Sequence, residues 1–175
     1  SASFSIIHLP SMPSGETRRS VSEQLSVLKN DILSGFSSFD DVIKNVSENL
    51  GSGGDLGFTL RGSLFEEFES VAYNLSVGEI GGPVETPAGF HLIKLLDKRG
   101  EKIHTKHVLL PVFPSEKDVS MSLEKITSLF NTHKNKSWEI DSLALVYRDL
   151  YNDSFSGVFN NVYYLEIFPE GLASV

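Results

Sequence analysis

The chain of 175 residues contains no cysteine, which excludes disulfide bonds, thiol catalysis and cysteine-ligated zinc sites. Basic residues are also scarce. The 15 Lys and Arg residues stand against 23 Asp and Glu, and the net charge of −8 argues against a nucleic-acid-binding surface. No run of about 18 consecutive apolar residues occurs, so the sequence predicts no membrane span. The chain begins at Ser1 without the charged and apolar regions of a secretory signal, so we expect that signal to be absent from it.

Apolar residues, by contrast, are plentiful. They make up 40% of the chain and include 12 phenylalanines, which is enough material for a packed core. Charged residues contribute 22%, so wholesale disorder is not expected. The length allows one domain or two small ones. Composition therefore predicts a folded, acidic protein.

The most informative pattern is an internal repeat. Residues 4–9 and 104–110 both have the pattern of a short buried strand, and each is followed by a proline-containing turn and a helical pattern. Each apolar residue of the first helical pattern lies 98 positions before its counterpart in the second. These residues are Val21, Leu25, Leu28 and Ile32, and Val119, Leu123, Ile126 and Phe130. We interpret the chain as two copies of one unit.

The rest of the first copy alternates between helical and strand patterns. A helix is predicted over residues 39–46, and a glycine-dense loop over residues 50–57. A third apolar helical face follows in residues 65–75, and residues 83–86 and 89–96 have the pattern of a hairpin. This order predicts an α+β domain in which helices cover a small antiparallel sheet.

A charged segment separates the two copies. The first copy has histidines at positions 8 and 91, which are 83 residues apart, and the same spacing from His107 passes the end of the chain. We therefore expect the second copy to be partial. The divisions that we assign are a first domain of residues 1–98, a linker of residues 99–102 and a partial second domain of residues 103–175.

A series of residues in the first copy carries a family resemblance. The series is Gly54-Asp55-Leu56-Gly57, Arg61-Gly62, Phe68-Glu69, Leu75, Gly78-Glu79, Gly82-Pro83-Val84, Thr86 and Gly89-Phe90-His91-Leu92-Ile93. In this order and spacing it resembles the parvulin family of peptidyl-prolyl cis–trans isomerases, over about residues 4–98. The repeat of the unit is similar to the tandem periplasmic foldases of the SurA type.

The resemblance implies a proline-binding pocket with a hydrogen-bond network behind it. His8 and His91 match the paired core histidines of the family, and Thr86 matches the hydroxyl that hydrogen-bonds the pair. Asn49 falls where the family has Cys or Asp, and we assign it a catalytic position that faces the substrate carbonyl. The apolar residues that match the lining of the pocket are Leu56, Leu64 and Phe68.

The function implied is isomerisation of X–Pro bonds, by non-covalent twisting of the amide in an apolar pocket, to assist the folding of exported proteins. The alternative is a chaperone or peptide-binding module of the same fold with weak or absent turnover. Asn49 and Thr59 favour this alternative because both depart from the family pattern. The second copy lacks the Gly-Asp-Leu-Gly series, so we expect no isomerase activity from it.

The resemblance also implies partners and location. Clients would be Pro-containing or unfolded polypeptides, and the protein would be periplasmic or otherwise exported.

We expect no cofactor, and no metal either, because the histidines after residue 103 have neither zinc spacing nor carboxylate support. The unfinished second sheet would leave an exposed edge, which predicts a homodimer. Glu66, Glu67 and Glu69 are interpreted as an exposed helix face.

Overall fold

The structure, a computed structural model, describes residues 10–49 and 51–133. The chain divides into one compact unit of residues 8–132 and another of residues 1–7 with 133–175. Apart from His133, the described residues all belong to the first unit. In these described ranges no helix combines the length and the apolar character that crossing a membrane requires.

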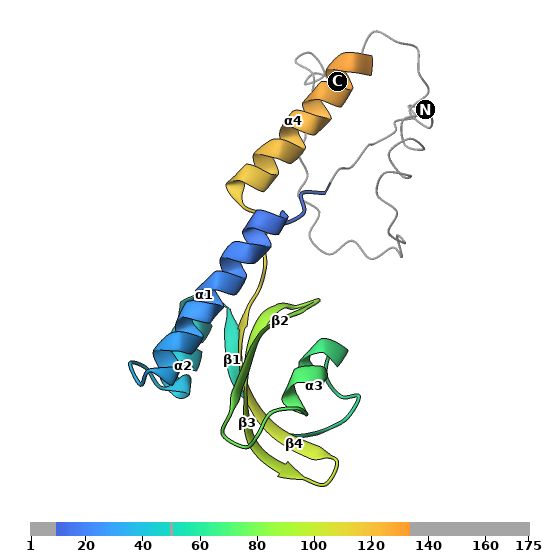
Figure 1. Ribbon diagram of the computed structural model, residues 1–175. Coiled ribbons are helices and arrows are strands. Elements are labelled where there is room, and N and C mark those ends of the chain that lie inside the picture. The colour runs from blue at the N-terminus through green and yellow to red at the C-terminus, as the bar shows by residue number, and fades with distance from the viewer. Residues whose placement is uncertain (1–9, 50, 134–175) are drawn as a thin grey trace, which may run out of the picture. The chain divides into compact units, whose positions relative to one another are not determined.

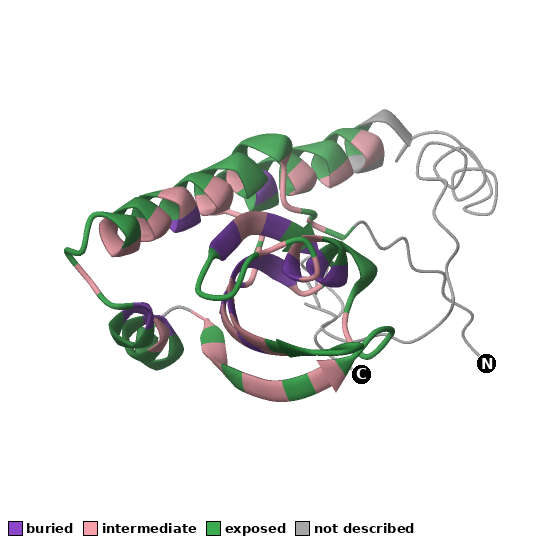
Figure 2. Cartoon of the chain, turned by 60° about the horizontal axis from the view of Figure 1, so that its bottom comes forward, coloured by how far each residue is buried: buried purple, intermediate pink, exposed green. Residues whose placement is uncertain are grey.

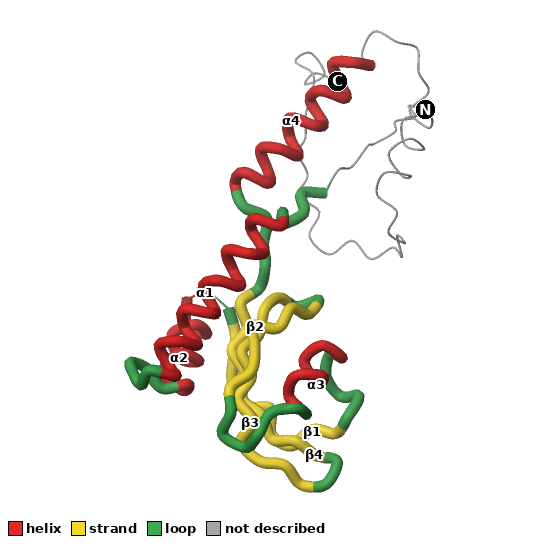
Figure 3. The backbone as a smooth tube through the Cα atoms, viewed as in Figure 1, coloured by secondary structure: helices red, strands yellow, loops and turns green. Residues whose placement is uncertain are grey.

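The described residues form four helices and four strands (Figures 1 and 3). The helices are α1 (Gly15–Leu33), α2 (Phe39–Asn49), α3 (Glu66–Ala72) and α4 (Glu116–His133), and the strands are β1 (Ser52–Leu60), β2 (Ile80–Thr86), β3 (Gly89–Arg99) and β4 (Lys102–Leu110). The strands form one sheet in the order β1-β4-β3-β2, and all neighbours are antiparallel. The expected α+β class, with helices on a small antiparallel sheet, is confirmed.

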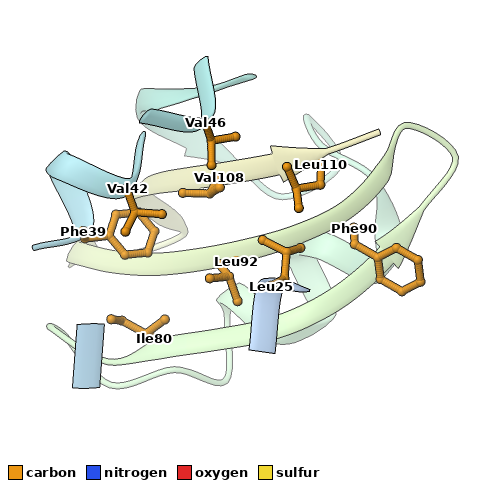
Figure 4. Packing of buried hydrophobic residues seen from close by; sticks show 9 residues of the cluster. All are labelled: Leu25, Phe39, Val42, Val46, Ile80, Phe90, Leu92, Val108 and Leu110. Carbon is orange, nitrogen blue, oxygen red and sulfur yellow. The ribbon is translucent and has the colours of Figure 1, made fainter. Parts of the chain in front are cut away.

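One face of the sheet is covered by α1 and α2, and this side holds the larger apolar cluster (Figure 4). The face predicted for α1 packs there, because Leu25 is fully buried and Val21, Leu28 and Ile32 lie against the cluster. The buried members are Leu25, Phe39, Val42, Val46, Ile80, Phe90, Leu92, Val108 and Leu110. The helical spacing in the sequence therefore identified the correct face of α1.

The opposite face of the sheet is covered by α3 (Figure 1). Phe68 and Ala72 of this helix pack with Ile93 and Leu95 of β3 and with Ile103 of β4, and all five side chains are buried. Figure 2 colours the buried parts of the chain purple. The sheet thus has a core on each face, as its near-continuous runs of buried residues in β3 require.

The glycine-dense segment is a strand, and the loop predicted over residues 50–57 is wrong for the described part of that segment. It forms most of β1, which is an edge strand paired with β4. The physical reason is close approach of two backbones, because a Cβ atom on Gly53 would lie 2.7 Å from the carbonyl oxygen of His107. Glycine density here reflects strand contact rather than a turn.

The strand predicted over residues 104–110 is present as β4, and it lies between β1 and β3 in the sheet. Ile103, Thr105 and Val108 on this strand are fully buried. The sequence pattern assigns the segment to a second copy, whereas in the structure it completes the sheet that α1, α2 and α3 cover. The division of the chain at residues 99–102 stays a prediction.

Candidate active site

Two histidines meet on the face of the sheet that α3 covers. His91 on β3 is buried, and its Nδ1 atom lies 3.4 Å from Nδ1 of His107 on the neighbouring strand β4. The two rings are nearly parallel, with an angle of 21° and centroids 5.6 Å apart. His8, which the family resemblance paired with His91, lies outside the described residues. The internal repeat assigned His107 to the second copy, and only the pairing of β3 with β4 brings it to His91.

Thr86 connects His91 to the turn between β2 and β3. Its hydroxyl lies 3.2 Å from the carbonyl oxygen of Gly89 and accepts from the N–H of Ala88 at 3.2 Å. The same hydroxyl lies 2.8 Å from His91 Nε2, a contact in which the tautomer of the ring decides the donor. The contact between His91 Nδ1 and His107 Nδ1 depends on the two tautomers in the same way. The result is a continuous chain of hydrogen-bonding groups from His107 through His91 to Thr86.

Both histidines are neutral at physiological pH. Burial lowers the pKa of His91 to about 4, and the nearby His107 adds to this effect. Burial also lowers the pKa of His107. A charged ring in this position would lose its hydration, and the part of the chain that the structure describes gives it no counter-ion. The pair is therefore an uncharged hydrogen-bonding element and not an ion pair.

This lowered pKa predicts a pH-dependent stability. Unfolded His91 takes up a proton near pH 6.5, whereas the folded protein does so only near pH 4, so stability is complete above the first value and falls as pH drops towards the second. Between pH 7.5 and 4.5 we expect this group to remove about 2–3 kcal/mol from the free energy of unfolding. Urea unfolding of wild type and His91→Gln at both pH values checks this. An unchanged pH dependence in the variant would contradict it.

Apolar side chains lie against the histidine pair. The Phe68 ring on α3 forms a T-shaped contact with His91, with ring centroids 5.5 Å apart and an angle of 89°, and its centroid is 6.1 Å from that of His107. Leu56 of β1 and Leu64 of the loop before α3 are partly buried against the same cluster. The structure thus brings together five of the predicted site residues: His91, Thr86, Leu56, Leu64 and Phe68.

Asn49 is in a different environment. It is the last residue of α2, it is exposed, and its side-chain amide donates to the backbone oxygen and to Oδ1 of Asn45 at 2.9 Å and 3.1 Å. Both hydrogen bonds of this amide stay on its own helix and neither reaches the histidine pair. Its catalytic role stays a prediction.

Sequence reasoning missed two features near the site. Glu69 was interpreted as part of an exposed face, which holds for Glu66 and Glu67 but is wrong for Glu69, since only 6% of this residue is exposed. Thr105 is fully buried two residues before His107 on β4, and its hydroxyl has no hydrogen-bond partner among the described residues. Helical period alone could not find Glu69, because its partners lie in a loop.

Within the described ranges, no three His, Cys, Asp or Glu side chains are grouped as a metal site requires.

Comparison with known proteins identifies relatives of this domain. The rotamase family model, described as a PPIC-type PPIase domain, matches residues 6–97. Foldase protein PrsA 2 of Bacillus cereus is 46% identical over 68 residues, which are 37% of this chain and 24% of that protein. Peptidyl-prolyl cis-trans isomerase Pin1 of Arabidopsis thaliana is 41% identical over 80 residues, which are 45% of this chain and 67% of that protein. Chaperone SurA of Pseudomonas aeruginosa is 33% identical over 91 residues, which are 49% of this chain and 21% of that protein.

The extent of these matches identifies the family of this chain but does not extend to the full length of its relatives. The chain covers no more than about a quarter of the foldase and chaperone relatives. The family match, however, takes in more than half of the 175 residues, and it contains β1, α3, β2 and most of β3. Thr86, His91 and the apolar residues beside them all lie within it. This chain therefore belongs to the PPIC-type family of peptidyl-prolyl isomerases.

Proposed function

We propose that the chain isomerises X–Pro bonds by non-covalent twisting of the amide between an apolar wall and a neutral histidine pair. The observation that carries the proposal is the T-shaped contact of the Phe68 ring with His91 and His107, beside the partly exposed Leu64. In this proposal His107 has the role that the family resemblance gave to His8. Thr86 is hydrogen-bonded to His91 of this pair.

The physical demand of the reaction fits such a site. The X–Pro amide must lose its resonance to cross a barrier of about 18–20 kcal/mol, and no bond to the substrate is made or broken. A twisted amide is less polarised than a planar one, so an uncharged, partly desolvated wall stabilises it relative to the ground state. Leu56, Leu64 and Phe68 would hold the proline ring, and His91 and Thr86 would keep the polar groups behind it fixed.

The proposed clients are unfolded polypeptides that contain proline, handled outside the cytoplasm. Two relatives bear the words foldase and chaperone in their names, and they match 68 and 91 residues of this chain. An acidic chain with apolar residues around its site suits apolar, unfolded segments better than polyanions.

A second candidate is a module that binds such segments with little turnover. Asn49 favours it, because its amide is occupied by Asn45 and is not directed to the histidine pair. Thr59 also favours it, since its hydroxyl contacts the carbonyl oxygen of Ile103 at 3.4 Å in a position where the family carries an aromatic residue. Both candidates use the same apolar wall, so they differ in the rate of X–Pro isomerisation and not in where the peptide binds.

The proposal includes a tandem, self-associating arrangement. Helix α4 carries Val119 and Leu123 at 47% and 42% exposure, whereas their counterparts in α1, Val21 and Leu25, pack on the sheet. A helix face of this kind is normally covered. We propose that α4 belongs to a partial second copy of residues 103–175, without isomerase activity, and that a second copy of the chain covers this face.

The test uses exchange NMR to measure the isomerisation of short X–Pro peptides in the presence of the full chain. Leu64→Ala is expected to lower the catalysed exchange rate about tenfold, which corresponds to the loss of about 1.4 kcal/mol of contact with the proline ring. Leu33→Ala is the matched control, because Leu33 is 64% exposed at the end of α1, and it should leave the rate unchanged.

The two candidates give different outcomes. No acceleration by wild type, with peptide-induced shifts at Leu64, Phe68 and His91, would identify the binding module. Acceleration that is the same in Leu64→Ala and wild type would exclude this pocket as the site of isomerisation.

A further inference from the structure

Glu69 is a buried carboxylate that the proposed mechanism does not use. It lies on α3, directly after Phe68, and only 6% of it is exposed. Both of its oxygens accept from the backbone N–H of Gly62 at 2.8 Å, and Oε1 also accepts from Ser63 and Leu64 at 3.0 Å and 3.1 Å. Three consecutive N–H groups of one loop therefore converge on a single side chain of the helix.

This convergence needs both a special backbone and a charge. Gly62 has φ +84°, which lies in the left-handed region that a residue with a side chain rarely adopts. Successive N–H groups that point to one side form a concave site for an anion, and the carboxylate of Glu69 fills it. These N–H groups, with that of Gly62 first, hold the pKa of Glu69 below its ordinary value, and Arg61 contributes in the same direction. The carboxylate is thus ionised at neutral pH and fully engaged.

The loop that Glu69 holds also carries a wall of the pocket. Leu64 donates its N–H to Glu69 and packs its side chain against the cluster that contains Phe68. The side chain of Glu69 therefore connects the loop to the same turn of α3 from which Phe68 faces the histidine pair. Among the described residues, Glu69 is the only side chain that accepts from these three N–H groups.

We propose that Glu69 is a positioning residue which holds Leu64 opposite Phe68 and so determines the affinity of the proline pocket. This inference rests on the proposed function, because it assigns Glu69 a role at the same pocket. It predicts an effect on peptide binding and little effect on the twisting step, since Glu69 touches neither the histidines nor the reacting amide.

The experiment measures binding of a short X–Pro peptide to the full chain by NMR titration. Glu69→Gln keeps the size of the side chain but removes its charge, and it should raise the Kd about tenfold while changing the exchange rate of the saturated peptide by less than about twofold. Glu66→Gln is the matched control, because it removes the same charge from an exposed position on α3 and should leave the Kd unchanged.

A double-mutant cycle distinguishes positioning from general destabilisation. If Glu69 acts through Leu64, then Glu69→Gln should raise the Kd by less than about twofold when Leu64 is already alanine. The amide resonances of Gly62, Ser63 and Leu64 should shift in Glu69→Gln and remain in place in Glu66→Gln. Multiplicative effects on Kd in the double variant would overturn the inference.

The same cycle separates this inference from the proposed function. If Leu64→Ala alone leaves peptide binding unchanged, the pocket itself is misplaced and the proposed function fails. If Leu64→Ala weakens binding but Glu69→Gln does not, the pocket stands and the role of Glu69 is overturned. Should Glu69→Gln fail to fold, Glu69→Asp keeps the charge on a shorter side chain, and an unchanged Kd in that variant would likewise overturn the role.

Discussion

Replacement of Val108 by aspartate is expected to unfold the sheet. Val108 is fully buried in β4, where it pairs with Leu92 of β3 on one side and with Gly53 of β1 on the other. A carboxylate at this point has no counter-ion in the apolar cluster around it, so it should lower the free energy of unfolding by more than about 4 kcal/mol. Since domains of this size have about 5–15 kcal/mol of stability, most of the folded population should be lost. Circular dichroism during thermal and urea unfolding measures this loss.

Val77→Asp is the matched control for Val108→Asp. The same residue type is replaced, but Val77 is 62% exposed and lies in the turn between α3 and β2. We expect Val77→Asp to change the free energy of unfolding by less than about 0.5 kcal/mol. Equal losses in the two variants would mean that Val108 is not buried in the centre of the sheet.

Phe68→Ala should have the second-largest effect. The Phe68 ring is 2% exposed and contacts both histidines, so its removal leaves a cavity in the core under α3. Truncation of a buried phenylalanine to alanine lowers the free energy of unfolding by about 3–5 kcal/mol. We expect this loss in urea unfolding, together with loss of X–Pro peptide binding under conditions where the variant remains folded.

Phe65→Ala is the matched control for Phe68→Ala. Phe65 lies three residues earlier, just before α3, and is 46% exposed. Its truncation should change stability by less than about 0.5 kcal/mol. If both variants lose the same stability, the packing of α3 on the sheet differs from that described. If Phe68→Ala unfolds more easily but binds peptide as wild type does, Phe68 is core and does not line the pocket.

Local patterns in the sequence were sufficient for the helices, whereas one half of the site came from the family resemblance. The spacing of Val21, Leu25, Leu28 and Ile32 predicts the buried face of α1 because a helix repeats every 3.6 residues whatever it packs against. Thr86 and His91 lie on a short hairpin, β2 to β3, so their contact depends on few residues and follows from their order.

Contacts between distant segments could not be predicted in this way. His107 reaches His91 only because β4 enters the sheet beside β3, and nothing in the residues around it distinguishes this from a second sheet. The environment of Glu69 depends on the φ angle of Gly62, which a helical pattern does not report. Gly53 illustrates the same limit, since its role is set by the backbone of β4 and not by its neighbours.

The central position of β4 has a consequence for the order in which the chain folds. β2, β3 and β4 follow one another with short turns, so they can pair as soon as they are made, whereas β1 precedes them all and pairs only with β4. On a chain that grows from its N-terminus, β1 has no partner strand among the described residues until β4, which begins at Lys102, has been synthesised. The β1–β4 pairing also spans the longest separation in the sheet, which makes it the slowest contact to close. We therefore expect the segment that brings Leu56 to the proposed pocket to be the last to be set in place, so that the pocket is complete only when the sheet is.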